Sequence, residues 1–242
     1  MDLSKNDPIP KIIHYCWFGG KPLSNLGEKC IASWKKHLPD YKIMRWDEDN
    51  FDVNSVLYTK ESYHVKKYAF VSDYVRYKVL YDFGGVYMDT DVEVIRNLYE
   101  FLDNEAFSGF EDEYMVAPGL ILGSIKGNSL MKDMMEKYLH THFIKPDHTY
   151  NLTTCPQNLT ELLLSRGLER KDVYQKISGL SIYPKEYFCP KSWITRKLEI
   201  TANTYTIHHY EGSWLPKLSK FQKFKKYIRN LLGILKSKIL KF

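Results

Sequence analysis

Hydrophobic and polar positions alternate along the chain in patterns that predict strands and helices in turn. Short apolar runs bounded by Gly, Pro, Asp or Asn predict strands, and apolar residues spaced by three or four positions predict helices. The predicted strands span residues 9–17, 41–46, 83–95, 106–110, 120–122, 180–183 and 204–209. The predicted helices span residues 26–38, 69–83, 129–142 and 156–165. This order predicts an α/β fold with one mixed sheet flanked by helices, and ligands at the strand ends.

The segment FGGVYMDTDVEVI, residues 83–95, contains two carboxylates in an otherwise apolar stretch. On a continuous strand Asp89 and Asp91 project from the same face, because side chains alternate with a period of two. Two neighbouring acids repel unless a cation or hydrogen-bond donors compensate them. Oxygen ligands of this kind suit Mg²⁺ or Mn²⁺, which leave positions open for the phosphates of a nucleotide diphosphate. The alternative is a solvated strand end with no ligand.

The preceding helix carries a second polar pair, Asp73 and Arg76. At a spacing of three residues they share one helix face. Arginine suits phosphate groups and aspartate suits sugar or ribose hydroxyls. An ion pair on the helix surface is the alternative interpretation.

Composition changes this picture mainly at the C-terminus. The chain has 242 residues, of which 44% are hydrophobic and 15% aromatic, enough for one domain with a full core. Residues 217–242 hold nine Lys or Arg and no acid; since the total charge is +6, the first 216 residues carry −3. We therefore expect a domain over residues 1–216 and a separate basic segment over residues 217–242.

The basic segment repeats apolar residues at helical spacing, with Lys and Arg between them. This pattern predicts an amphipathic C-terminal helix that lies on an anionic membrane surface. A helix packed on the protein's own core is the alternative, and nucleic-acid binding is disfavoured because no reader motif accompanies the charge. The apolar positions are Phe221, Phe224, Ile228, Leu231, Leu232, Leu235, Ile239 and Phe242.

Cysteine usage and the chain start favour a cytoplasmic protein. The four cysteines form no CxxC pair, and the first residues lack the apolar core of a signal peptide. No run of about 18 apolar residues predicts a membrane span. Neither a P-loop motif nor the dinucleotide fingerprint G-x-G-x-x-G occurs, so those nucleotide-binding classes are disfavoured.

The stretch AFVSDYVRYKVLYDFGGVYMDTDVEVI resembles the DxD-containing sugar-binding region of glycosyltransferase family 32. These are retaining enzymes that include bacterial capsule and lipopolysaccharide glycosyltransferases, and the catalytic domains of clostridial glucosylating toxins are related to them. IPKIIHYCWFGG resembles the family's opening strand, NLTTCPQNLTELL its middle segment and IHHYEGSW its closing motif. The resemblance implies a GT-A fold, a nucleotide-sugar donor that is usually UDP-linked, and Mn²⁺ or Mg²⁺ as cofactor.

The resemblance also implies roles for the motif residues. Asp73 would bind donor hydroxyls, Arg76 the sugar or diphosphate, Asp89 the ribose and the metal, and Asp91 the metal directly. Negative charge that develops on the β-phosphate would then be stabilised by the metal and Arg76. These four residues are the expected catalytic set.

Further donor and metal contacts are implied outside that set. Trp17 would stack on uracil, although a core tryptophan is the alternative. His209 would complete the metal site, with His208 as the alternative because neighbours on a strand face opposite ways. Ser213 and Trp214 would cover the diphosphate.

The function implied is transfer of a hexosyl residue from a UDP-sugar to a glycan acceptor, expected to be lipid-linked, in bacterial capsule or surface polysaccharide synthesis. The enzyme would sit peripherally on the inner face of the cytoplasmic membrane. The alternatives are a toxin-like transferase with a protein acceptor, and a nucleotide-sugar-binding module without turnover. One departure concerns Thr154-Cys155-Pro156, where the family pattern is Thr-Gly-Pro; the cysteine would reshape the donor or acceptor pocket.

Overall fold

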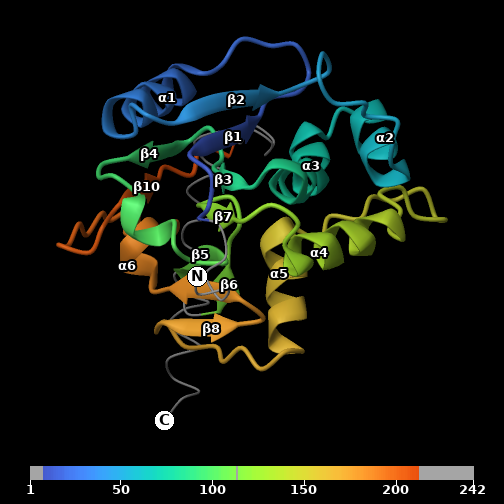
Figure 1. Cartoon of the computed structure of the whole chain (residues 1–242). Coiled ribbons are helices and arrows are strands. Elements are labelled where there is room, and N and C mark those ends of the chain that lie inside the picture. The colour runs from blue at the N-terminus through green and yellow to red at the C-terminus, as the bar shows by residue number, and fades with distance from the viewer. Residues whose placement is uncertain (1–7, 113, 213–242) are drawn as a thin grey trace, which may run out of the picture.

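The computed structural model of the chain describes residues 8–112 and 114–212. Within them, an eight-stranded sheet has the order β2-β1-β3-β7-β5-β9-β8, with β6 paired to β5 (Figure 1). The pairs β1–β2, β1–β3 and β5–β9 are parallel, and β3–β7, β5–β7 and β8–β9 are antiparallel. The strands are β1 (Ile12–Cys16), β2 (Lys42–Trp46), β3 (Gly85–Tyr87), β5 (Ala106–Asp112), β6 (Met115–Val116), β7 (Leu122–Ser124), β8 (Gln175–Ile177) and β9 (Leu180–Tyr183).

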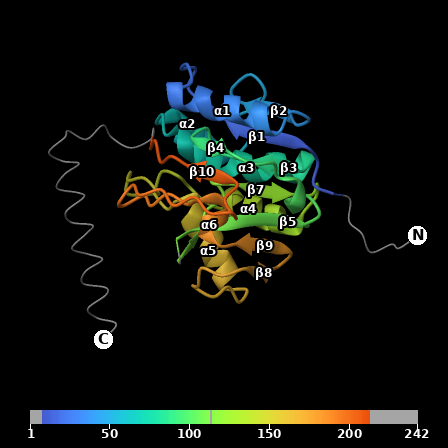
Figure 2. The ribbon, with the colours of Figure 1, turned by 90° about the vertical axis from the view of Figure 1, so that its left-hand side faces the viewer.

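Helices cover both faces of this sheet (Figures 1 and 2). On one face lie α2 (Leu57–His64), α3 (Tyr68–Phe83), α4 (Ser129–Leu139) and α5 (Cys155–Leu164). On the other lie α1 (Asn25–His37), the short helices η1 (Tyr99–Phe101) and α6 (Lys185–Phe188), and a ribbon of β4 (Val92–Val94) and β10 (Thr206–His208). The expected mixed α/β sheet flanked by helices is confirmed.

Each face has its own hydrophobic core. Val75 and Leu80 of α3 pack with Leu122 of the sheet on one side, and Trp34 of α1 packs with Phe107 on the other. These side chains are fully buried. Because the sheet is covered on both faces, β1 and β3 are apolar on both, as expected for buried parallel strands.

The parallel strands determine where the site forms. Ile13 and His14 of β1 lie opposite Val86 and Tyr87 of β3, so the two strands end at the same edge of the sheet. Gly84 and Gly85 connect α3 to β3, and their φ angles of 65° and 109° favour glycine. A Cβ at Gly84 would also lie 2.8 Å from the Lys126 backbone nitrogen. The sharp turn therefore brings the residues of α3 and those after β3 close together.

The prediction of one continuous strand over residues 83–95 is wrong. β3 ends at Tyr87, β4 begins at Val92, and the residues between them form a turn. The physical reason is that β3 belongs to the large sheet whereas β4 pairs with β10 in a separate ribbon, so the chain must leave one sheet to reach the other. The expected C-terminal helix and the segment 217–242 lie outside the described residues. None of the described helices is long and apolar enough to cross a bilayer.

Candidate active site

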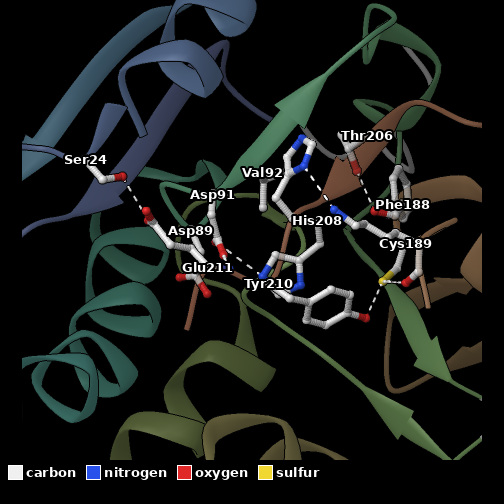
Figure 3. A network of polar contacts seen from close by, with 12 residues as sticks. Ser24, Asp89, Asp91, Val92, Phe188, Cys189, Thr206, His208, Tyr210 and Glu211 are labelled. Carbon is white, nitrogen blue, oxygen red and sulfur yellow. Dashed lines mark hydrogen bonds and ion pairs between the residues drawn. The ribbon is translucent and has the colours of Figure 1, made fainter. Parts of the chain in front are cut away.

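The turn between β3 and β4 brings the two aspartates together. The Val92 backbone N–H donates to the Asp89 carbonyl at 3.1 Å, which closes the turn, and the Asp89 N–H donates to the Gly119 carbonyl at 2.9 Å. Asp89 is half-buried and Asp91 is buried. A ligand oxygen of each carboxylate and a ring nitrogen of His208 lie within 4.8 Å of one another (Figure 3). The turn, rather than strand alternation, therefore makes this cluster.

α3 supplies the polar pair behind Asp89. The Arg76 guanidinium lies 3.1 Å from Asp73 Oδ1 and 3.6 Å from Asp89 Oδ1. It also stacks over the Tyr87 ring at 4.7 Å from its centroid, and the Tyr87 hydroxyl donates to Asp89 Oδ1 at 3.0 Å. Burial raises the pKa of Asp73 to about 7, although Arg76 opposes that change. Burial likewise raises the pKa of Asp89. The predicted pair is thus a buried ion pair joined to the turn, not a surface pair.

The ribbon brings a histidine to the second aspartate. β10 runs antiparallel to β4 with His208 opposite Val92, and His208 Nε2 lies 3.3 Å from Asp91 Oδ1. Burial alone would raise the pKa of Asp91, but the hydrogen bond and charge of His208 and the Glu211 N–H hold it below its ordinary value. Burial opposes protonation of His208, yet Asp91 raises its pKa well above the ordinary value. Among the described residues, His208 Nδ1 is buried without a hydrogen-bond partner.

Of the two neighbouring histidines, the structure places His208 beside the carboxylates, and not His209, the expected ligand. His209 Nε2 lies 2.8 Å from Glu93 Oε2, and its Nδ1 lies 3.5 Å from Lys191 Nζ. The His209 backbone N–H still donates to the Asp91 carbonyl at 2.9 Å. Since consecutive residues of an extended segment point to opposite sides, only His208 reaches the carboxylates.

Two site residues were missed from the sequence, Glu211 and Gly119. The backbone turns at Tyr210, whose φ is 56°, and this aims the Glu211 N–H at Asp91 Oδ2 at 2.7 Å. The Glu211 carboxylate then accepts from Ser24 Oγ at 2.9 Å (Figure 3). A Cβ on Gly119 would lie 2.2 Å from Asp89 Oδ2. Glu211 lies in the IHHYEGSW motif, but no residue spacing indicates that its backbone N–H contacts Asp91. Gly119 is one of 13 glycines, and no neighbouring residue marks it as part of the site.

Of the remaining residues predicted to contact the donor, the structure describes Trp17 but not Ser213 or Trp214. Trp17 follows β1 at the same sheet edge as the aspartates, is half-buried, and donates from Nε1 to the Lys21 carbonyl at 2.6 Å. Ser213 and Trp214 lie outside the described residues. Cys155 is buried at the start of α5, with Sγ 3.2 Å from the Tyr77 hydroxyl. The thiol of the Thr-Cys-Pro segment therefore packs against α3.

The residues present fit a divalent cation. Two carboxylates and an imidazole form a ligand set that Mn²⁺ accepts, and Mg²⁺ accepts its oxygen part. Their ligand atoms converge within 4.8 Å. Arg76 contacts Asp73 and Asp89, and without a metal the protonated His208 pairs with Asp91. A metal ion bound there would take the place of the His208 proton. A cation at this point would relieve the repulsion between the two turn carboxylates.

The fold and the site together define an α/β protein with an acidic, cation-compatible site where parallel strands end. Residues 24–108 match the family model described as the glycosyltransferase sugar-binding region containing the DXD motif. The matched stretch includes Asp73, Arg76, Asp89 and Asp91. The resemblance to DxD-containing glycosyltransferases is thereby confirmed.

Individual relatives are glycosyltransferases by name. The chain is 31% identical over 110 residues to inositol phosphoceramide mannosyltransferase 3 of Schizosaccharomyces pombe, covering 41% of this chain and 29% of that protein. It is 34% identical over 108 residues to an uncharacterized glycosyltransferase of Acanthamoeba polyphaga mimivirus, covering 39% and 40%. The chain thus matches less than half the length of both relatives. Among solved structures, the PaToxG glycosyltransferase is similar with a TM-score of 0.49 and 18% identity, covering 66% of this chain and 70% of that one.

Proposed function

We propose that this protein is a metal-dependent glycosyltransferase that moves a hexosyl residue from a nucleotide sugar, most simply a UDP-sugar, to a glycan hydroxyl with retention. The observation that carries the proposal is the convergence of Asp89, Asp91 and His208 at the edge of the sheet. The two aspartates lie inside the matched sugar-binding region, and His208 comes from a distant strand. With a divalent cation bound between these residues, the site would suit an anionic ligand such as a diphosphate.

In this proposal, Asp89, Asp91 and His208 hold Mn²⁺ or Mg²⁺, which supplies Lewis-acid stabilisation to the diphosphate when bound. Arg76 neutralises Asp73 and Asp89 and keeps both carboxylates in place. Asp73 then accepts hydrogen bonds from hydroxyls of the sugar. Trp17, half-buried at the same edge, offers its ring to the base.

The leaving group needs no proton from the protein. When the bond to the anomeric carbon breaks, the electron pair stays on the β-phosphate oxygen, and fixed positive charge stabilises it. Arg76 contributes to that charge from behind Asp89. A pair of carboxylates arranged for glycoside hydrolysis is therefore not required.

For the acceptor, we propose a lipid-linked glycan, as in capsule or other surface polysaccharide synthesis, with the enzyme held on the cytoplasmic face of a membrane. The inositol phosphoceramide mannosyltransferase acts, by its name, on a lipid headgroup, which supports a glycolipid acceptor. The basic, apolar sequence of residues 217–242 supports attachment to an anionic leaflet.

The test is nucleotide release from a panel of UDP-, GDP- and other nucleotide sugars, with Mn²⁺ or with chelator. Wild type should release nucleotide from one donor in a metal-dependent way, and Asp91→Asn should lose at least about 100-fold in rate. Asp82→Asn is the matched control, because Asp82 ends α3 in a partly exposed pair with Lys78. A donor that binds with Mn²⁺ but is not turned over, even with glycan acceptors present, would indicate a binding module instead.

A further inference from the structure

A hairpin lies between α6 and β10 and is not part of the proposed chemistry. Residues 190–200 form it: Lys191 and Leu198 make an antiparallel bridge, and the Glu199 N–H donates to the Pro190 carbonyl at 3.1 Å. The Ser192 N–H donates to the Lys197 carbonyl at 2.9 Å, next to the turn. In Figures 1 and 2 this orange part of the chain projects outward from α6, on the face of the sheet that carries the β4–β10 ribbon. We call residues 190–200 the rim hairpin.

The rim hairpin is fixed to the strand that supplies the site histidine. Arg196 Nη1 donates to the carbonyls of His209 and Tyr210 at 3.3 and 3.4 Å. Its guanidinium also lies over the Tyr210 ring, 5.7 Å from the centroid. Lys191 Nζ lies 3.5 Å from His209 Nδ1. Because His208 precedes these residues, whatever the hairpin contacts is held at a set distance from the carboxylate site.

Large apolar side chains of this hairpin face solvent. Trp193 is 41% exposed, Leu198 43% and Ile200 56%. In an extended segment, residues 198 and 200 point to the same side. A single exposed apolar residue needs no explanation, but three within eleven positions concentrate exposed apolar groups in one short segment.

The charges of the same hairpin are mostly positive. Lys191, Arg196 and Lys197 are its cations, and Glu199 is its one acid. Glu199 is already paired with Lys197 at 2.5 Å. Arg196 contacts backbone carbonyls, so its full charge remains uncompensated by any carboxylate that the described residues bring to it. The hairpin therefore joins exposed apolar groups with net positive charge.

We propose that the rim hairpin docks on the surface of an anionic lipid bilayer. Tryptophan favours the membrane interface, Leu and Ile gain by partial burial among acyl chains, and each Lys or Arg gains from anionic headgroups. A sugar-binding platform fits less well, because two of the three exposed apolar side chains are aliphatic and cannot stack on a sugar ring, and the cations outnumber the one acid. This contact goes beyond the transfer reaction and orients the site edge toward the membrane.

A fluorescent probe on the hairpin tests this directly in the full-length chain. All four native cysteines are buried, so a cysteine introduced at an exposed position is labelled selectively in the folded protein. Trp193→Cys carrying an NBD dye should brighten at least about twofold with vesicles of phosphatidylcholine and phosphatidylserine, because the dye enters an apolar layer. Leu139→Cys is the matched control: Leu139 is 49% exposed at the end of α4, on the opposite face of the sheet, and its dye should not respond.

A second measurement quantifies the contact. The double variant Trp193→Ser/Leu198→Ser should lower the partition coefficient onto these vesicles by about tenfold, whereas Leu139→Ser should not. Vesicle binding without any change in the dye at position 193 would overturn the proposal and assign the membrane contact to another segment. A double variant that partitions normally but binds soluble glycan acceptor more weakly would also overturn it, in favour of an acceptor platform. Nucleotide release without lipid reports on the transferase proposal separately.

Discussion

The candidate site has two halves that are built in different ways. The inner half consists of Asp73, Arg76 and Asp89, from one helix and the turn after the strand that follows it, and its ion pairs join residues close in sequence. The outer half consists of Asp91, His208 and Glu211, and its contacts join residues more than 100 positions apart. Arg76 and Asp73 keep side-chain exposures of only 6% and 10%.

This difference separates two tasks. In the inner half one buried guanidinium holds two carboxylates, so changes there act first on the fold. In the outer half the ligand atoms of Asp91 and His208 point to a common position, so changes there act first on what binds. A motif residue can therefore be needed for the stability of the fold or for the binding of a ligand, and the two properties must be measured separately.

The largest expected effect is the loss of stability when Arg76 of the inner half is replaced. Arg76→Leu leaves the buried Asp73 carboxylate without its cation and should lower the free energy of unfolding by about 3–5 kcal/mol. Lys78→Leu, two positions along α3, breaks a partly exposed pair with Asp82 and should cost no more than about 1 kcal/mol. Urea denaturation measures both. Equal losses for the two variants would show that Arg76 has no special structural role.

The next effect concerns the support beneath the inner half. His14 is fully buried; its Nδ1 accepts from Trp46 Nε1 at 3.0 Å, so its Nε2 must carry the proton and donate to the Gly84 carbonyl at 2.8 Å. Burial lowers the pKa of His14 from 6.5 to about 4. The unfolded chain therefore binds the extra proton first, and stability that is complete above pH 6.5 falls as the pH drops toward 4.

The loss through His14 should reach at most about 3.5 kcal/mol, because the pKa falls from 6.5 to about 4 and each pKa unit corresponds to about 1.4 kcal/mol. Urea denaturation at a series of pH values measures it. His14→Gln keeps polar contacts but does not titrate, so its curve should be flatter between pH 6.5 and 4. If both proteins lose stability in parallel, other groups cause the acid sensitivity.

A smaller effect is expected on Mn²⁺ affinity when a histidine of the outer half is replaced. In the proposed metal site, His208→Gln removes one ligand and should weaken Mn²⁺ binding by at least about tenfold. Because it also removes the buried partner of Asp91, the free energy of unfolding should fall as well. His209→Gln, next in sequence but directed at Glu93, should leave the affinity close to that of wild type. Isothermal titration with Mn²⁺ alone measures both. A larger loss for His209→Gln would restore the original assignment.

The smallest effect lies where the two halves meet. In Gly119→Ala the new methyl group would lie 2.2 Å from Asp89 Oδ2, so the carboxylate must move. We expect Mn²⁺ affinity to fall by several-fold and stability to fall by about 1–3 kcal/mol. Gly27→Ala is the control, since its added Cβ makes only ordinary contacts of 3.4 Å or more. Unchanged Mn²⁺ binding in Gly119→Ala would mean that Asp89 tolerates displacement.

The sequence predicted the inner half well, because its parts are close in the chain. Helical spacing placed Asp73 and Arg76 on one face, and Gly84 marked the end of α3. Periodicity failed at residues 88–91, where an apolar pattern continued across a turn between two sheets. The choice between His208 and His209 depended on the register of β10 against β4, and the role of Gly119 on a close approach between loops. Such long-range contacts leave no local pattern.

The β4–β10 ribbon also sets the order in which the site can be completed during synthesis. Among the described strands, β4 pairs only with β10, so it remains an unsatisfied edge until the segment around His208 leaves the ribosome. A nascent chain that has folded the parallel strands already displays the DxD turn but has no imidazole beside it. The proposed cation site is therefore completed only when β10 pairs with β4, and until then β4 is an exposed edge strand that can pair wrongly.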